Sequence, residues 1–146
     1  MTSAKAAIIT LLTDATRKAH VDGTKGTVID HWPNKEDYTS REWIISVGPV
    51  IGADAQISSL GSFSKWIREV IQVDVWVMEK REKSYTVMEK IRSDLVQDVD
   101  RCLHHYSGNP GAGFTHVNAL GWRELDEVGL LRSSMTLEMF YEKAQA

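Results

Sequence analysis

The sequence contains a single cysteine, Cys102, and no apolar run long enough to cross a bilayer. One cysteine cannot form a disulfide within the chain, and the position of Cys102 on an apolar helical stripe predicts core packing. Residues 6–12 are apolar, but they are too few to span a membrane, and no cleavage site of small residues follows them. We therefore expect synthesis in a reducing cytoplasm, with no signal peptide and no membrane partner.

Positive charge is also scarce. The 17 Lys and Arg residues are outnumbered by 20 Asp and Glu residues, which gives a net charge of -3 and a pI near 5.9. Sequence-independent binding of nucleic acid needs clustered Lys and Arg residues to displace counterions, so the composition argues against such binding. A local basic patch is still compatible with the composition. We expect no sequence-specific nucleic-acid partner.

Motifs that carry chemistry are missing as well. The five histidines show neither His-x-x-x-His spacing nor a paired Cys-x-x-Cys beside them. The glycine-rich segment 108–113 lacks the Lys-Ser/Thr of a phosphate-binding loop, and no serine sits in a nucleophile elbow. Asp74 and Glu79 faintly resemble a nuclease carboxylate pair, but Glu79 and the adjacent Lys80 diverge on an extended chain. We predict no catalytic residue, no metal ligand, no cofactor and no enzymatic activity.

The strongest pattern that is present covers residues 66–106. From 66 to 78 the side chains alternate, which predicts a strand about twice the usual length. Its aliphatic face holds Ile67, Ile71, Val73, Val75 and Val77, and its other face holds Arg68, Gln72 and Asp74. After the charged segment 80–83 the period becomes helical, with Ser84 as N-cap and Gly108 and Pro110 as the stop. The helical stripe comprises Tyr85, Met88, Ile91, Leu95, Val99, Cys102, Leu103 and Tyr106.

The N-terminal third is less regular. Apolar residues at helical spacing predict a helix over 3–20 that ends at Gly23 and Gly26. A short apolar run, 27–32, predicts a strand that is broken by Pro33 and the polar stretch 34–40.

The remaining segments read mainly as strands. Residues 42–47 alternate and predict a strand ended by Pro49, and 52–64 read as a loop or a long hairpin tip. Beyond the long helix, 115–122 and 131–141 predict further strands. No strand and crossover helix repeat, which argues against a parallel doubly wound sheet. With 146 residues we predict one domain, 1–146. Its class is α+β, with a mainly antiparallel sheet of about four strands and two amphipathic helices packed on one face.

Two groups of apolar residues are candidates for contacts with a partner. Loop 52–64 contains apolar side chains without a core period, and two tryptophans of the long strand fall on the face opposite its aliphatic row. These interface candidates are Ile57, Leu60, Phe63, Trp66 and Trp76. The other interpretation is that the loop folds back on the sheet and that a loop or the N-terminal segment covers the tryptophans.

The order of these elements resembles a known family. The N-terminal helix, Trp32-Pro33 before a polar break, the strand 43–47, the long strand with Val-Asp-Val-Trp at 73–76, the helix 85–106 and the closing strand 130–141 look like the tail terminator, or tail-completion, proteins of long-tailed bacteriophages. The similarity covers most of the chain.

This resemblance implies a structural virion protein, of a phage or a prophage. Members of the family form homo-oligomeric rings, commonly hexamers, on the last layer of the tail tube. The ring ends tail polymerisation and offers a surface for head-tail joining. The implied partners are other copies of the chain, the tail tube protein and a head-completion or connector protein, and the implied location is the virion tail after synthesis in the host cytoplasm. The alternative function is a small-ligand-binding or regulatory α+β domain, or less readily a hydrolase with dispersed catalytic residues.

Overall fold

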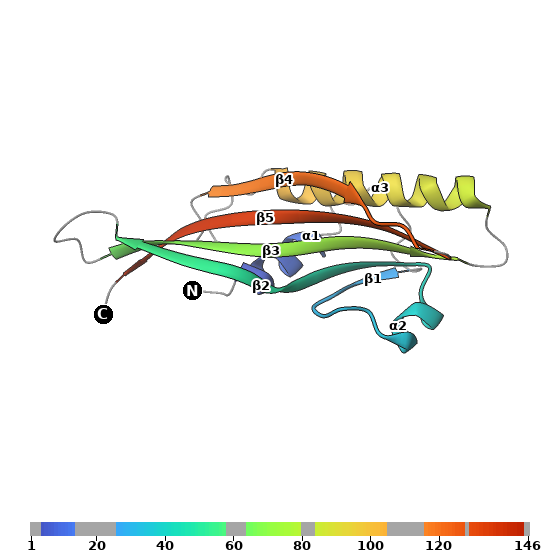
Figure 1. The fold of residues 1–146 in the computed structure, drawn as a ribbon, viewed down its shortest axis with the longest axis horizontal. Coiled ribbons are helices and arrows are strands. Elements are labelled where there is room, and N and C mark those ends of the chain that lie inside the picture. Colours follow the sequence, from blue (N-terminus) through green and yellow to red (C-terminus); the bar gives the residue numbers. More distant parts are fainter. Residues whose placement is uncertain are drawn as a thin grey trace.

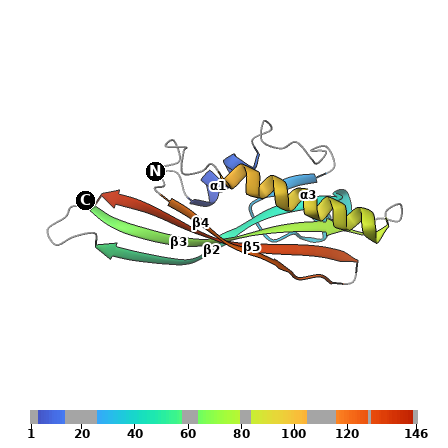
Figure 2. The same cartoon turned by 90° about the horizontal axis from the view of Figure 1, so that it is seen from above.

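The computed structural model describes residues 4–13, 26–57, 64–79, 84–104, 116–127 and 129–144. Within these ranges a five-stranded sheet forms one layer, and α1 and α3 lie together on one of its faces (Figures 1 and 2). The elements in chain order are α1 (Ala4–Leu12), β1 (Gly26–Ile29), α2 (Lys35–Ser40), β2 (Trp43–Ile57), β3 (Ser64–Met78), α3 (Tyr85–His104), β4 (His116–Glu124) and β5 (Leu130–Ala144).

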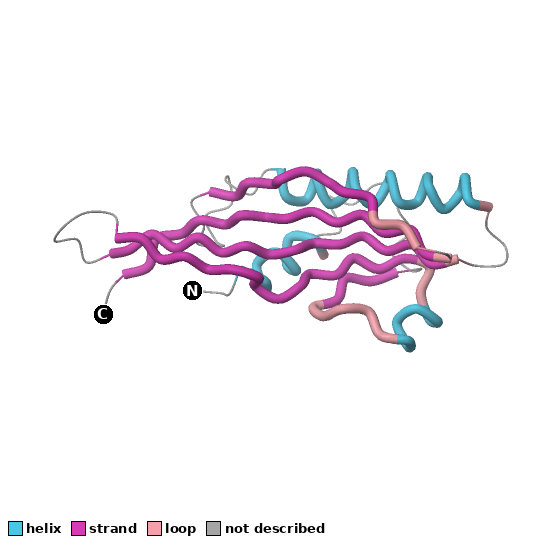
Figure 3. The backbone as a smooth tube through the Cα atoms, viewed as in Figure 1, coloured by secondary structure: helices cyan, strands magenta, loops and turns pink. Residues whose placement is uncertain are grey.

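The strand order is β1-β2-β3-β5-β4 (Figure 3). β3 lies in the centre, antiparallel to both β2 and β5, and β4 is antiparallel to β5. The predicted α+β class is therefore right, but the sheet has five strands and is mixed, because β1 pairs with β2 in the parallel direction. The connection that carries the chain from the end of β1 back to the start of β2 includes α2, which permits this parallel pair.

The core lies between the sheet and the two longer helices. The predicted aliphatic face of β3 is confirmed, since Ile71, Val73, Val75 and Val77 are all fully buried. The stripe of α3 covers them, and Cys102 is buried within it, as predicted. Tyr85, at the first helical position, is 59% exposed instead, and its hydrogen bond to Glu89 raises the pKa of its hydroxyl. None of the described helices is long and apolar enough to cross a membrane.

β2 runs far past its predicted end. It continues through Pro49 to Ile57, so the first part of the predicted loop 52–64 is strand, and residues 58–63 lie outside the described ranges. The register against β3 shifts between Val47 and Val50 and again between Val50 and Gly52. Such bulges accommodate a proline, which cannot donate to the ladder, within an otherwise continuous strand.

Gly26 has a packing role, whereas its sequence context suggested a helix stop. It opens β1 and pairs with Trp43, and a Cβ placed on Gly26 would lie 2.0 Å from Cδ2 of the indole and 2.4 Å from the Trp43 carbonyl oxygen. Only a residue without a side chain fits here. The helix that was predicted to end at Gly23 and Gly26 ends at Leu12, and residues 14–25 are outside the described part of the chain.

α2 corrects the polar stretch 34–40, which reads from sequence as a simple break. Asn34 accepts a hydrogen bond on Oδ1 from the Asp37 amide at 3.1 Å, and Asp37 Oδ2 accepts one from the Asn34 amide at 2.9 Å. These reciprocal bonds form a capping box, with Asp in the third position instead of the usual Glu or Gln. The Ser84 cap of α3 is as predicted, with Ser84 Oγ 3.3 Å from the Val87 amide.

Candidate assembly surfaces

Three strands extend beyond the helices as an arm, which we define as residues 54–57 of β2, 64–68 of β3 and 140–144 of β5, past Met139, the last of the described core residues of β5. Figures 1 and 2 show this end of the sheet reaching past α1 and α3. Backbone pairing continues to the end of the arm, where Ile57 pairs with Lys65 and Lys65 with Lys143. At about 3.3 Å per residue, five residues span roughly 16 Å. At the base of the arm, Arg68 Nε donates to Glu138 Oε2 at 2.5 Å.

The predicted interface residues separate into two groups. Ile57 and Trp66 are in the arm, where Trp66 pairs with Gln56 of β2 and Glu142 of β5. Leu60 and Phe63 belong to residues 58–63 and lie outside the described residues. Trp76 lies far from the arm and is only 4% exposed. Within one copy of the chain Trp76 is thus covered by another segment, and its role at an interface stays a prediction.

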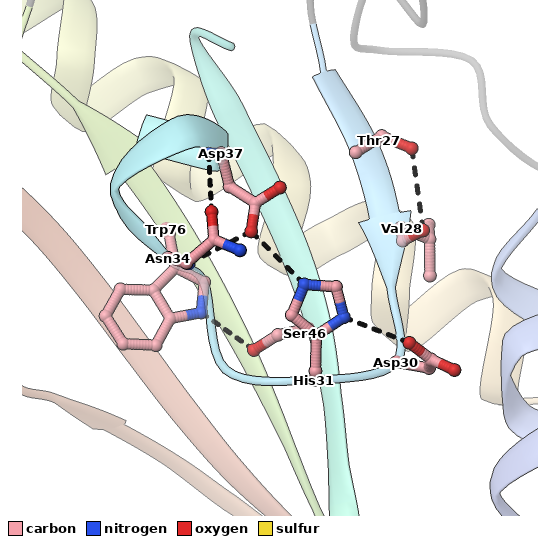
Figure 4. A network of polar contacts seen from close by, with 8 residues as sticks. All are labelled: Thr27, Val28, Asp30, His31, Asn34, Asp37, Ser46 and Trp76. Atoms are coloured by element: carbon pink, nitrogen blue, oxygen red, sulfur yellow. Dashed lines mark hydrogen bonds and ion pairs between the residues drawn. The ribbon is translucent and has the colours of Figure 1, made fainter. Parts of the chain in front are cut away.

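Trp76 is covered on the outer sheet face by two side chains, Arg132 and Trp32. The guanidinium carbon of Arg132 lies 4.6 Å from the Trp76 ring centroid and 4.7 Å from that of Trp32. The two indoles also meet edge to face at 5.5 Å. Trp76 Nε1 donates to Ser46 Oγ at 2.8 Å (Figure 4). Cation–π and edge-to-face contacts favour this arrangement, which fixes the segment after β1 against the sheet.

A buried carboxylate anchors the same arginine. Asp74 is 2% exposed, and its Oδ2 accepts from Arg132 Nη2 at 2.8 Å and from Nε at 3.2 Å. Gln72 Nε2 donates to Asp74 Oδ1 at 3.1 Å and to Ser134 Oγ at 2.9 Å. We call Gln72, Asp74, Arg132 and Ser134 the Asp74 cluster. Its hydrogen bonds compensate for removing the charges from water. The cluster is therefore built around an ion pair between the central strand β3 and its neighbour β5.

Sequence periodicity placed Asp74 on the polar face, but it gave no sign of burial. The cluster forms because cross-strand register aligns Ser46, Asp74 and Ser134 in one row of β2, β3 and β5. Arg132 then lies one row away, beside Trp76. The only available signal was the Trp32-Pro33 pair, since a tryptophan before a proline in a polar break needs a surface to pack on.

His31 holds the segment between β1 and α2. Its Nδ1 lies 3.0 Å from Asp30 Oδ1 and its Nε2 lies 3.2 Å from Asp37 Oδ2 (Figure 4). These two carboxylates raise the pKa of the His31 imidazole above its usual value, with the Asp30 hydrogen bond the larger cause. The Asn34 amide and His31 in turn lower the pKa of Asp37. His31 thus links the capping box of α2 to the end of β1.

Protonation of His31 should make stability depend on pH. Because its pKa is raised in the folded state, the stabilisation is complete below the unfolded value of about 6.5 and is lost as pH rises through the folded pKa. We expect the melting temperature of the native protein, relative to His31→Gln, to fall between pH 6 and pH 8. The effect should be small, since the imidazole is half exposed. A constant difference across this range, measured by calorimetry, would contradict the assignment.

At the end opposite the arm, α3 is tied to the turn between β4 and β5. Arg92 is 6% exposed, donates through Nη1 to Asp126 and lies 3.4 Å from Glu124 Oε1. Asp126 Oδ1 also accepts from the Arg132 amide at 3.1 Å. Trp122 Nε1 donates to Asp100 on α3 at 3.0 Å. These contacts hold β4 under the helix, and no local sequence signal predicted them.

The described side chains offer no constellation for metal chemistry, since no three His, Cys, Asp or Glu residues among them converge on one point. His31 binds carboxylates, His104 ends α3 and His116 begins β4. His20 and His105 lie outside the described ranges.

The sheet has two open edges within the described residues. β1 pairs only with Trp43–Ser46 of β2, so the rest of β2 has a described neighbour on one side alone, which is β3. β4 forms the opposite margin, where its described partner is β5. Its register shifts between Ala119 and Trp122, around Gly121 with φ of 87°. Strand edges without a partner strand can serve as pairing surfaces unless they are protected.

This chain shares its fold with a virion protein. A chain in the virion of a native gene transfer agent (GTA) particle matches with a TM-score of 0.60 and covers 97% of this chain and 96% of its own length, at 16% sequence identity. No family model matches the sequence, and no curated protein matches it. At this identity the likeness defines the fold alone.

Proposed function

We propose that the protein is a structural component of a phage-like virion, and specifically that it caps the tail tube as a ring. The full-length likeness to a chain of the GTA virion carries this proposal, because nearly all of both chains takes part. The arm and the two open edges support it, since a subunit that builds a ring needs different surfaces on its two sides. The resemblance in element order to tail terminators supports the finer role.

The proposed mechanism requires no catalysis. Copies of the chain form a closed ring, near six subunits, that docks on the last layer of the tail tube. Its opposite face lacks the surface on which another tube layer would assemble, so polymerisation stops, and this face meets the head-completion or connector protein. In this proposal the protein is made in the host cytoplasm and resides in the virion tail. In this proposal two features keep the subunit rigid: the buried ion pair of Asp74 and Arg132, and the capping box of Asn34 and Asp37 at α2.

Light scattering of the purified protein across concentration, with negative-stain images of large species, tests ring formation. We expect closed rings near six subunits. A monomer at every concentration that is stabilised thermally by a small metabolite would overturn the proposal in favour of a ligand-binding domain.

Capping itself is tested with the tube protein encoded in the same genome. Addition of the protein to polymerising tubes should shorten and narrow their length distribution, and images should show a ring at one end. A variant lacking residues 55–61 is the matched comparison, because it removes the end of the arm and leaves the helix-covered body intact. Unchanged tube growth with the native protein would contradict capping, whereas capping by the shortened variant would exclude only the arm end.

A further inference from the structure

We propose that neighbouring copies of the chain join their sheets edge to edge, with the open edge of β4 on one copy pairing antiparallel with the open edge of β2 on the next. The inference rests on the proposed ring and names its subunit contact. The occupant of each edge is thus a second copy of this chain.

Strand direction favours this pairing. β4 runs opposite to β5, β5 runs opposite to β3, and β3 runs opposite to β2. β4 and β2 therefore run in opposite directions. When two copies stand side by side with their sheets continuing in the same sense, the two edges meet antiparallel, which forms the regular perpendicular ladder.

The two edges also lie at matching positions along the strand direction. Following the register across the sheet, His116 aligns with Phe140, Arg68 and Asp54. In the same way Ala119 aligns with Leu137, Ile71 and Val50. Residues 116–119 of β4 are thus aligned, across the sheet, with residues 50–54 of β2, where the open part of β2 begins. A sheet can continue from one copy to the next without sliding along the strands.

The irregular positions mark the limits of the contact. β2 pairs regularly with β3 from Gly52 to Ile57, beyond the bulges near Pro49. β4 pairs regularly with β5 from His116 to Ala119, before its own register shift. Bulges and prolines normally protect a strand edge against pairing with another chain. Here they lie next to the two regular stretches and not within them, so each stretch keeps a short row of backbone groups that can pair. Main-chain hydrogen bonds then supply the contact, as in other cases of strand addition.

Each edge contact is heterologous, because an edge of one kind meets an edge of the other kind. Repetition of such a contact closes into a ring when the rotation between copies is suitable. The twist of neighbouring strands, about 20–25° for each pair, supplies a rotation between successive sheets. Pairing of β4 with β4, or β2 with β2, would instead stop at a two-fold dimer.

Proline substitutions at neighbouring positions block one edge at a time. The N–H groups of neighbouring strand residues point to opposite sides, so of Ala53→Pro and Asp54→Pro one removes a donor to β3 and the other removes a donor on the open edge. The same holds for Val117→Pro and Asn118→Pro in β4. In each pair, the variant that keeps the native melting temperature is the edge variant, and the one that melts early is its internal control.

Each edge variant alone should remain a monomer at concentrations where the native protein forms rings. A 1:1 mixture of the β2-edge and β4-edge variants should give a heterodimer of twice the 16.4 kDa chain mass, because one intact edge of each kind remains. Light scattering measures both results. Rings formed by either folded edge variant, or a homodimer of one variant, would overturn the edge contact. A native protein that never self-associates would overturn it too.

These outcomes are separable from failure of the proposed function. If the edge variants still form rings and cap tubes, the edge contact is wrong and the capping role stands. If the mixture gives the heterodimer but the native rings do not affect tube growth, the contact is right and capping is wrong.

Discussion

Asp74→Ala is expected to lower the free energy of unfolding by about 3–5 kcal/mol, as for other buried ion pairs that lose one partner. Asp74 is 2% exposed, and its removal leaves the Arg132 guanidinium, which is 17% exposed, without its carboxylate. Gln72 Nε2 also loses an acceptor. The arginine would then sit between two indoles with its charge uncompensated. Urea denaturation followed by far-UV circular dichroism measures the loss.

Glu138→Gln is the matched control for Asp74→Ala. It also disrupts an ion pair between β3 and β5, but Arg68 in that pair is 37% exposed. Partly exposed pairs contribute about 1 kcal/mol or less. Similar losses of unfolding free energy in the two variants would show that burial of the Asp74 cluster does not strengthen its contribution to stability. Tryptophan fluorescence gives a local readout, because Arg132 contacts both Trp32 and Trp76 and should move in Asp74→Ala alone.

Leu95→Ala should cost about 3–5 kcal/mol, the range for a large-to-small change at a buried leucine. Leu95 is 1% exposed and lies in the middle of α3, where the helix packs on the sheet. Its removal leaves a cavity between two rigid elements that cannot close fully. The midpoint of chemical denaturation, with an unchanged slope, measures the effect.

Val87→Ala on the same helix is the control for Leu95→Ala. Val87 is 45% exposed, and alanine has a higher helix propensity than valine, so this variant should change the unfolding free energy by no more than about 0.5 kcal/mol. Equal effects of the two variants would mean that α3 is held mainly by its polar contacts and not by burial of its apolar stripe. The contacts of Arg92 and Trp122 would then carry the attachment.

Much of the fold could be predicted because burial follows periodicity. The alternation of β3 correctly identified its buried face, and the stripe of α3 correctly identified Leu95, Val99 and Cys102 as core. Element ends were less predictable. Pro49 reads as a stop, but a bulge absorbs it, and whether a bulge forms depends on the neighbouring strand. α2 was missed because its box uses Asp37 where Glu or Gln is usual.

The candidate surfaces could be predicted only in part. Ile57 and Trp66 do lie in the projecting arm. Trp76 was placed on the correct face, but periodicity describes only which side a residue takes and cannot show that a segment 44 positions earlier in the chain, at Trp32, packs over it. The open edges were also beyond prediction, because strand order decides which strands are marginal.

The sequence by itself determined the class of the fold, the long central strand, the amphipathic helix that covers it and the core positions of both. These follow from local patterns, since the period of apolar residues is set by backbone geometry. Tertiary structure alone decided the parallel addition of β1, the burial of Asp74 against Arg132, the cover over Trp76 and the identity of the two edges. Each of these depends on which distant strands become neighbours, and the chain encodes that choice only through the summed packing of all its elements.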